Sequence, residues 1–487
     1  MRRALVAALV VAAALRLWNI GSVPLELHPD EMAGYLGVRD MLAGRTPWTP
    51  FIDYRVLYLP LYGAFEVASA TLLGPSISSL RLPAALLGVA TAYVTGALAW
   101  RFERRPAVFV LGAATMAILP WDVAIARVGW EPAATLPFLV GGVVLLWRGL
   151  EDGRGRDVAL GFVVLALGAY SYRAESFDAA WLAATLLAVF AGRLRRVARG
   201  LALGAAAGAL VIAPLVVSFA RNPVYFSSGP AQTTFGPGVN ATTLGVFFSL
   251  YRMHFAPDAL FGSGDGNLQH GPATGVLYWW MLPFALAGLA AIVVRGDPAR
   301  RAMALSWLLL FPVGGSLADD GRAHFIRTLV GAPLACVLAA NGVYALFAFA
   351  ARRSVSRRSR YAGATALVLV AAYELARFAH VYFDEYPTAS AEIFHYGDRD
   401  VFAFVRAHEA SYDRVCFTAL DPWNYPADIE YYLGGDAITA IEGAGGDCVK
   451  PRTLLVLAKI ADAPAGSRTL ATIQKRDGTT RAWIFER

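Results

Sequence analysis

Residues 25–40 read LELHPDEMAGYLGVRD, and they begin shortly after residues 4–20, an apolar segment long enough to cross a membrane. Asp30 and Glu31 are adjacent in this stretch. A carboxylate pair beside a bilayer is costly unless it is solvated, paired or used in a function. The rest of the chain must therefore supply water, a partner or a role for these two side chains.

The composition predicts an integral membrane protein. Of the 487 residues, 57% are hydrophobic and only 16% are charged, which is too apolar for a soluble globular protein of this size. The formal net charge is +7. The basic residues occur in short clusters between apolar runs, where they are typical of topology signals rather than of a nucleic-acid surface. We therefore expect no nucleic-acid partner.

Apolar runs of spanning or near-spanning length predict about eleven transmembrane helices. Several runs are shorter than the ~20 residues that a bilayer core requires, so their ends are expected to line a polar cavity. The first run resembles a signal peptide, but no convincing cleavage site follows it, and we interpret it as a retained span. The runs are residues 4–20, 79–100, 106–121, 132–147, 157–172, 177–192, 200–219, 274–294, 302–317, 327–350 and 361–380.

One further run, Tyr58–Leu73, decides the side of every later loop. If it does not cross the membrane, the arginine clusters all fall on the cytoplasmic side, as the positive-inside rule requires. We therefore predict a juxtamembrane or re-entrant helix there, with residues 21–78 and 221–273 as external loops. The N-terminus is then cytoplasmic, and the chain leaves its last span on the outside.

The composition divides the chain into residues 1–380, a transmembrane domain, and residues 381–487, which are more polar and richer in Gly, Pro and Asp. The second part is predicted to be a small extracytoplasmic α/β domain, with a helix over 396–410. Its strands are RVCFTAL, TLLVLA and a hairpin that turns at Asp477-Gly478. Outside the cytoplasm, Cys416 and Cys448 are candidates for a disulfide, whereas Cys336 lies in an apolar run and is expected to be a packing residue.

Two interpretations of the carboxylate pair remain open on the residues alone. Pro29 suits the first turn of a helix, whose positive end favours ionised carboxylates, so Asp30 is a candidate base. In the alternative, Asp30 and Glu31 simply cap an interfacial helix.

Other predicted external loops place isolated charges at the same membrane face. Arginines that topology does not require have a natural partner in a phosphate, which a guanidinium binds through two hydrogen bonds. The alternative is that each pairs with a nearby carboxylate or lipid headgroup. These loops contain Asp122, Arg127, Trp130 and Glu131, then Arg173 and Glu175, and then Arg322, His324 and Arg327.

Two further motifs carry less information. DRD at 398–400 matches a nucleotide-sugar metal motif in spacing but is short, and it lies in the domain predicted outside the cell. FGSGDGNLQHG, residues 261–271, is glycine-rich but does not join a strand to a helix, so we expect a flexible loop. No zinc-ligand spacing appears in the sequence.

The order of several motifs resembles bacterial members of the GT-C superfamily, related to protein O-mannosyltransferases and to the lipid A aminoarabinose transferase. The likeness covers roughly residues 1–350. Here YLPLY has a leucine where related sequences often show a second proline, and IARVG has alanine where serine is common. The motifs are HPDE, YLPLYGAFEV, SSLRLPAALLGVATAYV, ILPWDVAIARVGWEP, GAYSYRAESF and HFIRTLVGAPLACVLAANGVY.

The resemblance implies transfer of one sugar, mannose or a related sugar, from a polyprenyl-phosphate carrier to an envelope glycan, lipid or protein on the external face, usually with inversion. It implies that Asp30 is the general base and Glu31 a supporting acid. Arg127, Arg173 and Arg327, with Arg322 and His324, would stabilise the lipid phosphate, so we expect no metal or other cofactor to be required. Tyr58, Tyr62, Trp130, Glu131 and Glu175 are the candidate substrate contacts.

Two other classes of protein remain as alternatives. A transporter or flippase of lipid-linked sugars predicts charges near the bilayer midplane and paired interrupted helices. The charges here gather at one external face, which favours an enzyme. An inactive scaffold for envelope assembly is the third interpretation.

Overall fold

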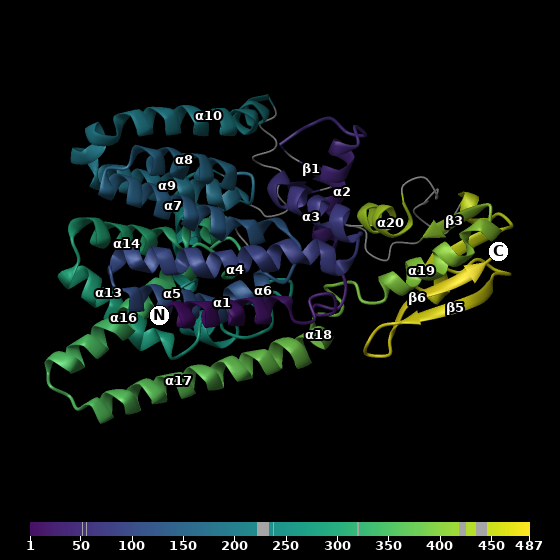
Figure 1. The fold of residues 1–487 in the computed structure, drawn as a ribbon. Helices are drawn as coiled ribbons and strands as arrows, with labels where there is room; N and C mark the ends of the chain where they lie inside the picture. The colour runs from purple at the N-terminus through teal and green to yellow at the C-terminus, as the bar shows by residue number, and fades with distance from the viewer. Residues whose placement is uncertain are drawn as a thin grey trace.

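The computed structural model describes residues 1–487 except 51, 55, 222–232, 237, 319–320, 418–424 and 435–445. Of residues 52–54, 56–58, 425–426 and 446–447 it describes the backbone alone. Helices dominate residues 1–389, and a small sheet lies in the C-terminal region (Figure 1).

Each of the eleven predicted apolar runs contains an α-helix. Five segments among the described residues are long and apolar enough to cross a membrane: Ile77–Phe102, Glu131–Asp152, Ala191–Arg221, Gly331–Arg352 and Arg357–Ala389. Two shorter helices, Pro106–Ile118 and Met281–Arg295, are also apolar. The chain is therefore a multi-pass membrane protein, and the number of eleven crossings remains a prediction.

The helices of the bundle follow in chain order. They are α1 (Arg2–Leu17), α4 (Ile77–Phe102), α5 (Pro106–Ile118), α6 (Pro120–Ile125), η1 (Glu131–Ala134), α7 (Thr135–Asp152), α8 (Gly155–Gly168), α9 (Arg173–Val189), η2 (Ala191–Val197), α10 (Ala198–Arg221), α12 (Ala241–Met253), η3 (Asp258–Gly262), α13 (Met281–Arg295), α14 (Pro298–Leu310), α15 (Val313–Ser316), α16 (Gly331–Arg352), α17 (Arg357–His380), η4 (Val381–Glu385) and α18 (Tyr386–Ala389).

Small residues allow these helices to approach closely. A Cβ atom on Gly342 of α16 would lie 1.8 Å from the carbonyl oxygen of Phe284 in α13. Only glycine fits such a crossing, which is how helices of a membrane bundle commonly pack.

The first predicted external loop forms a compact cap on the bundle. It contains α2 (Pro29–Leu42), the antiparallel pair β1 (Ile52–Tyr54) and β2 (Val56–Tyr58), and α3 (Pro60–Leu73). α2 and α3 lie at the end of the bundle that faces the C-terminal domain (Figure 1). The helix predicted over 58–73 is thus the 14-residue α3, which packs against α2.

The C-terminal domain is a four-stranded sheet in the order β3-β4-β6-β5, with α19 (Asp398–His408) and α20 (Tyr425–Leu433) beside it. β3 (Arg414–Phe417) and β4 (Thr453–Leu457) are parallel, whereas β5 (Arg468–Gln474) and β6 (Thr480–Glu486) form the predicted antiparallel hairpin. Three short helices, η5 (Glu409–Ser411), η6 (Gly446–Val449) and η7 (Ile460–Asp462), complete it. A disulfide joins Cys416 to Cys448, and Cys336 is buried in the bundle.

Candidate functional site

The first turn of α2 presents Asp30. His28 is the N-cap, and its Nδ1 accepts the amide N–H of Asp30 over 3.1 Å. Glu31 completes the capping box by accepting the amide N–H of His28 over 2.8 Å. Capping is therefore performed by His28 and Glu31. The Asp30 carboxylate, whose side chain is 23% exposed, is left at the positive end of the helix.

A residue from a distant loop holds the Asp30 carboxylate in place. Gln269 Nε2 donates a hydrogen bond to Asp30 Oδ2 over 2.7 Å, and it also lies 3.3 Å from His28 Nδ1. Gln269 belongs to the glycine-rich segment that the sequence predicts to be a flexible loop. The loop instead contributes directly to the surroundings of Asp30.

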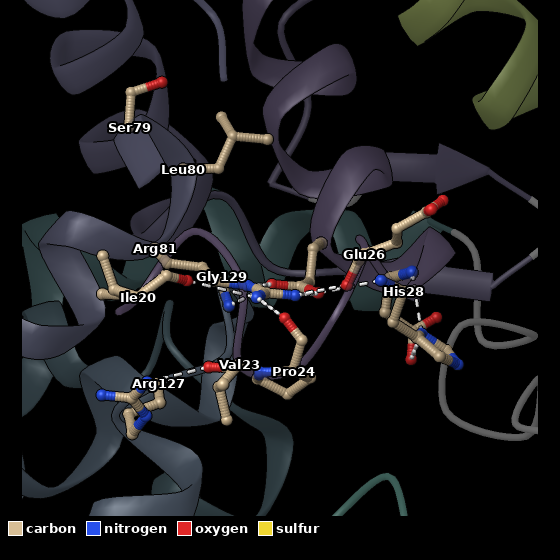
Figure 2. Close-up of polar contacts among 12 residues, drawn as sticks. Ile20, Val23, Pro24, Glu26, His28, Ser79, Leu80, Arg81, Arg127 and Gly129 are labelled. Atoms are coloured by element: carbon tan, nitrogen blue, oxygen red, sulfur yellow. Dashed lines mark hydrogen bonds and ion pairs between the residues drawn. The ribbon is translucent and has the colours of Figure 1, made fainter. Parts of the chain in front are cut away.

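Glu31 has a different environment from its neighbour, because it is fully buried in an ion pair. Arg81 donates to it through Nε over 2.7 Å and through Nη2 over 2.9 Å, and the amide N–H of Gly129 donates over 2.7 Å. Neither charged side chain is exposed to solvent. Arg81 also bonds the carbonyl oxygens of Pro24 and Glu26, as Figure 2 shows. Glu31 thus anchors the first external loop to α4.

Arg127 does not lie among the exposed charges, contrary to its predicted role as a phosphate ligand. It donates to the carbonyl oxygens of Leu15 and Arg16 over 2.8 and 3.1 Å. It also donates to the carbonyl oxygen of Val23 over 2.9 Å, the contact drawn in Figure 2. The side chain is fully buried. Leu15 and Arg16 belong to the last turn of α1, where backbone oxygens lack partners within the helix, and Val23 lies in the loop that follows. Arg127 therefore ties the end of α1 to the loop that follows it.

Several predicted residues do come together around Asp30. Glu131 begins η1, accepts the amide N–H of Leu59 over 3.0 Å, and lies near enough to Asp30 and Arg173 to interact with their charges. Tyr172, which precedes Arg173, lies near enough to Arg327, Glu131 and Arg173 to interact with their charges. Asp30, Glu131, Arg173 and Arg327 thus form one polar cluster at the cap end of the bundle.

Two histidines beside this cluster follow Trp130 in one row of rings. The ring centroids of Trp130 and His270 are 6.3 Å apart, and those of His270 and His324 are 4.7 Å apart. Burial lowers the pKa of His324 to about 2, and the positive charges of His270 and Arg327 add to this effect. His324 is therefore a neutral imidazole at physiological pH.

Asp265 ties the glycine-rich loop to the loop that contains His324. Its Oδ2 lies 2.6 Å from His270 Nδ1 and accepts the amide N–H of Phe325 over 2.9 Å. Sequence reasoning missed Asp265, Gln269 and His270. The signal available was the number of side chains with hydrogen-bonding groups in this glycine-rich run.

The remaining candidates lie away from the cluster or outside the description. Tyr62 is buried in α3, where its hydroxyl donates to the carbonyl oxygen of Leu80 over 2.8 Å. Glu175 is buried in α9 and bonds Ser171. Arg322 is exposed on its loop. The side chain of Tyr58 lies outside the described part of the structure.

A second buried acid adjoins Glu31. Glu66 of α3 is fully buried, and neither of its oxygens has a hydrogen-bond partner among the described residues. Burial raises the pKa of Glu66 well above its ordinary value, and the negative charges of Glu31 and Glu131 act in the same direction. Glu66 is therefore protonated more readily than an ordinary glutamate.

The C-terminal domain contacts the segment that leads into Asp30. The Glu26 carboxylate accepts the amide N–H groups of Gly397 and Arg399, each over 3.1 Å, at the start of α19. Arg39 of α2 pairs with Glu430 of α20. The C-terminal domain thus helps to hold the segment before Asp30 and the helix α2 in place.

Comparisons with solved structures identify the fold. ArnT from Cupriavidus metallidurans in the apo state aligns with a TM-score of 0.59 at 14% identity, over 99% of this chain and 97% of ArnT. The same protein bound to undecaprenyl phosphate aligns with a TM-score of 0.58 at 14% identity, with the same coverage. The Archaeoglobus fulgidus oligosaccharyltransferase with a tethered acceptor peptide gives 0.59 at 15% identity, over 89% of this chain and 63% of that protein.

ArnT and the oligosaccharyltransferase are members of the GT-C superfamily. No family model and no curated protein matches the chain by sequence. The chain has the GT-C fold over nearly its whole length.

Proposed function

We propose that this protein is a membrane glycosyltransferase that moves a single sugar from a polyprenyl-phosphate carrier to an acceptor of the cell envelope. The observation that carries the proposal is the partly exposed Asp30 carboxylate at the cap end of a GT-C fold, beside Glu131, which also lies near the charge of Arg173. The likeness to ArnT bound to undecaprenyl phosphate supports a polyprenyl phosphate as carrier.

In the proposed reaction, Asp30 removes the proton from an acceptor hydroxyl as its oxygen attacks C1 of the sugar. The new bond joins that oxygen to C1, and the bond from C1 to the phosphate oxygen breaks. Attack occurs opposite the leaving phosphate, so the configuration at C1 inverts. Gln269 holds Asp30 Oδ2, which orients the carboxylate for this proton transfer.

The leaving polyprenyl phosphate gains negative charge, and fixed cations nearby stabilise it. Arg173 and Arg327 are the proposed ligands; His324, which is uncharged, can contribute only a hydrogen bond, and Arg322 is exposed on its loop away from the cluster. A guanidinium stays charged at every physiological pH and binds phosphate through two hydrogen bonds, so the proposed chemistry requires no metal at the reacting bond. Trp130 and Glu131 are the proposed sugar contacts.

The proposed site faces the outside of the cell. With the N-terminus in the cytoplasm, the arginine clusters obey the positive-inside rule, and the cap and C-terminal domain are external. The disulfide between Cys416 and Cys448 supports this orientation, because disulfides persist mainly in oxidising compartments. The acceptor would be a glycan, lipid or protein of the envelope.

The proposal is tested by lipid analysis of a deletion strain. Mass spectrometry should detect accumulation of a polyprenyl-phosphate sugar; its mass gives the class of sugar, and chromatography of the released sugar against standards distinguishes isomers such as mannose and glucose. Complementation with the wild-type gene should remove the intermediate, whereas an Asp30→Asn gene should not. An unchanged lipid-linked sugar pool in the deletion strain would contradict the proposal.

A further inference from the structure

Two loops beside Trp130 bring three metal-ligating side chains together. Asp265 and His270 come from the glycine-rich loop, and His324 comes from the loop before α16. One ligand atom from each residue lies within 4.8 Å of the other two. The side chains of Asp265 and His270 are only 5% and 9% exposed. A carboxylate and two imidazoles are thus gathered at one place, and all three residues are partly buried.

Neighbouring groups orient the three side chains, as the outer contacts of metal ligands commonly do. Asp265 accepts the amide N–H of Phe325 over 2.9 Å, and His270 Nε2 contacts Asn267 Nδ2 over 3.1 Å. The amide of His324 donates to His254 Nε2 over 3.1 Å. Each of the three residues therefore has its position fixed by a residue outside the set.

We propose that Asp265, His270 and His324 bind one divalent transition-metal ion, for which zinc is the best match. Two histidines and one carboxylate are an established zinc ligand set, with a fourth position open to water. In a tetrahedral zinc site, ligand atoms about 2.1 Å from the ion lie about 3.4 Å from one another, so rotations of the side chains would have to draw together ligand atoms that now lie within 4.8 Å. The ion takes the place of the proton between His270 Nδ1 and Asp265 Oδ2, and that proton is released to solvent.

A second set of similar composition lacks this capacity. His395, Asp398 and Asp428 also lie within 4.8 Å of one another and are buried. There, however, Arg481 donates to both oxygens of Asp398, over 2.5 and 2.8 Å. A guanidinium already neutralises that carboxylate and would repel a cation, so the proposal concerns the first set alone.

The proposed ion has a structural role rather than a role at the reacting bond. Gln269 immediately precedes His270, and its side chain holds Asp30. An ion that joins the glycine-rich loop to the loop before α16 fixes Gln269 against Asp30. The importance of this positioning for catalysis rests on the proposed function. Binding of the ion does not.

The full chain, purified in detergent with a tag that lacks histidine, should contain about one equivalent of metal by inductively coupled plasma mass spectrometry. After removal with a chelator, added Zn²⁺ should restore one equivalent and raise the melting temperature. Asp265→Asn, His270→Gln and His324→Gln should each weaken Zn²⁺ binding at least about tenfold. His408→Gln, an exposed histidine of the C-terminal domain, is the matched control and should bind as the wild type does.

Metal content is measured without any transfer assay, so failure of this proposal is distinguishable from failure of the proposed function. If chelated wild-type protein that remains monodisperse takes up no Zn²⁺, the three side chains form only a hydrogen-bonded contact between loops, and the proposal is wrong. The same conclusion follows if the three variants bind Zn²⁺ as tightly as the control. Because the wild-type measurement needs no substitution, a variant that does not fold leaves the test intact.

Discussion

Gln269 donates a hydrogen bond to Asp30 over 2.7 Å although the two residues are 239 positions apart in the chain. One belongs to the loop before α13 and the other to the first turn of α2. Their contact joins the helix that carries the candidate base, α2 of the cap, to the loop that leads into α13 of the bundle. The orientation of Asp30 therefore depends on how the bundle packs.

Asp30→Asn should reduce sugar transfer by about 10²- to 10⁴-fold, which is the usual effect of losing a general base. Asparagine keeps an oxygen for Gln269 but cannot accept the acceptor's proton at neutral pH. Transfer is measured with purified protein in liposomes that contain the polyprenyl-phosphate sugar. The control is Asp400→Asn, an exposed carboxylate in the DRD motif, which should retain wild-type turnover. Full activity in Asp30→Asn would mean that Asp30 is not the base and would move the assignment to Glu131.

Gln269→Ala should lower turnover by about 10- to 100-fold, because a hydrogen bond to a charged group contributes about 1.5–3 kcal/mol. The KM for the lipid donor should stay constant, since Gln269 holds the carboxylate and not the phosphate. Steady-state kinetics over a range of donor concentrations separate the two effects. A rise in KM at constant turnover would show that Gln269 binds substrate instead.

Arg127→Ala should lower thermal stability, whereas Arg327→Ala should weaken use of the lipid donor. Loss of Arg127 leaves three buried carbonyl oxygens without a partner, at a cost on the order of 1–3 kcal/mol each, so the melting temperature should fall clearly. Loss of Arg327 should leave the melting temperature nearly unchanged and weaken donor use at least tenfold. Differential scanning fluorimetry and donor titrations distinguish the two. Equal thermal stability of both variants would contradict the structural role of Arg127.

The thermal stability of the Glu66→Gln variant should depend less on pH than that of the wild type. The pKa of Glu66 is raised in the folded chain, so at rising pH the unfolded chain ionises first and stability falls. Glutamine removes that dependence at nearly the same volume. The melting temperature of the variant should therefore exceed that of the wild type increasingly between pH 5 and about pH 8. A constant difference across this range would show that Glu66 finds a partner for its charge.

Labelling with a membrane-impermeant maleimide tests the orientation. In intact cells, Thr46→Cys in the first external loop and Ala465→Cys in the C-terminal domain should react, whereas Ser354→Cys between α16 and α17 should react only after lysis. All three positions are exposed. Native cysteines give a low background, because Cys336 is buried and the other two form the disulfide. The reverse pattern would invert the topology.

The sequence predicts the local elements well because their signals are local. Apolar runs predicted the helices, Pro29 predicted the start of α2, and Asp477-Gly478 predicted the turn of the β5–β6 hairpin. Each depends on neighbouring residues alone. The disulfide between Cys416 and Cys448 also agrees with the predicted oxidising side.

The partners of charged side chains were less predictable, because packing brings them together over long separations. Arg127 was expected to bind phosphate, but its carbonyl partners lie more than 100 residues away in the chain. Glu31 was expected to assist catalysis, but Arg81 neutralises it. One signal was available: Arg81 and Glu66 each interrupt an apolar run, and an ionisable residue there requires a specific partner or a shifted pKa.

The contact between Glu26 and the start of α19 has a consequence for biosynthesis. The carboxylate and the amides that it binds are 371 residues apart, so at about 5 to 20 residues per second the first waits roughly 20 to 75 seconds for the second. During that interval Glu26 must remain hydrated while the intervening helices are inserted. The segment before Asp30 thus reaches its final form only when translation is nearly complete, and a nascent chain that stops early is left without an assembled site.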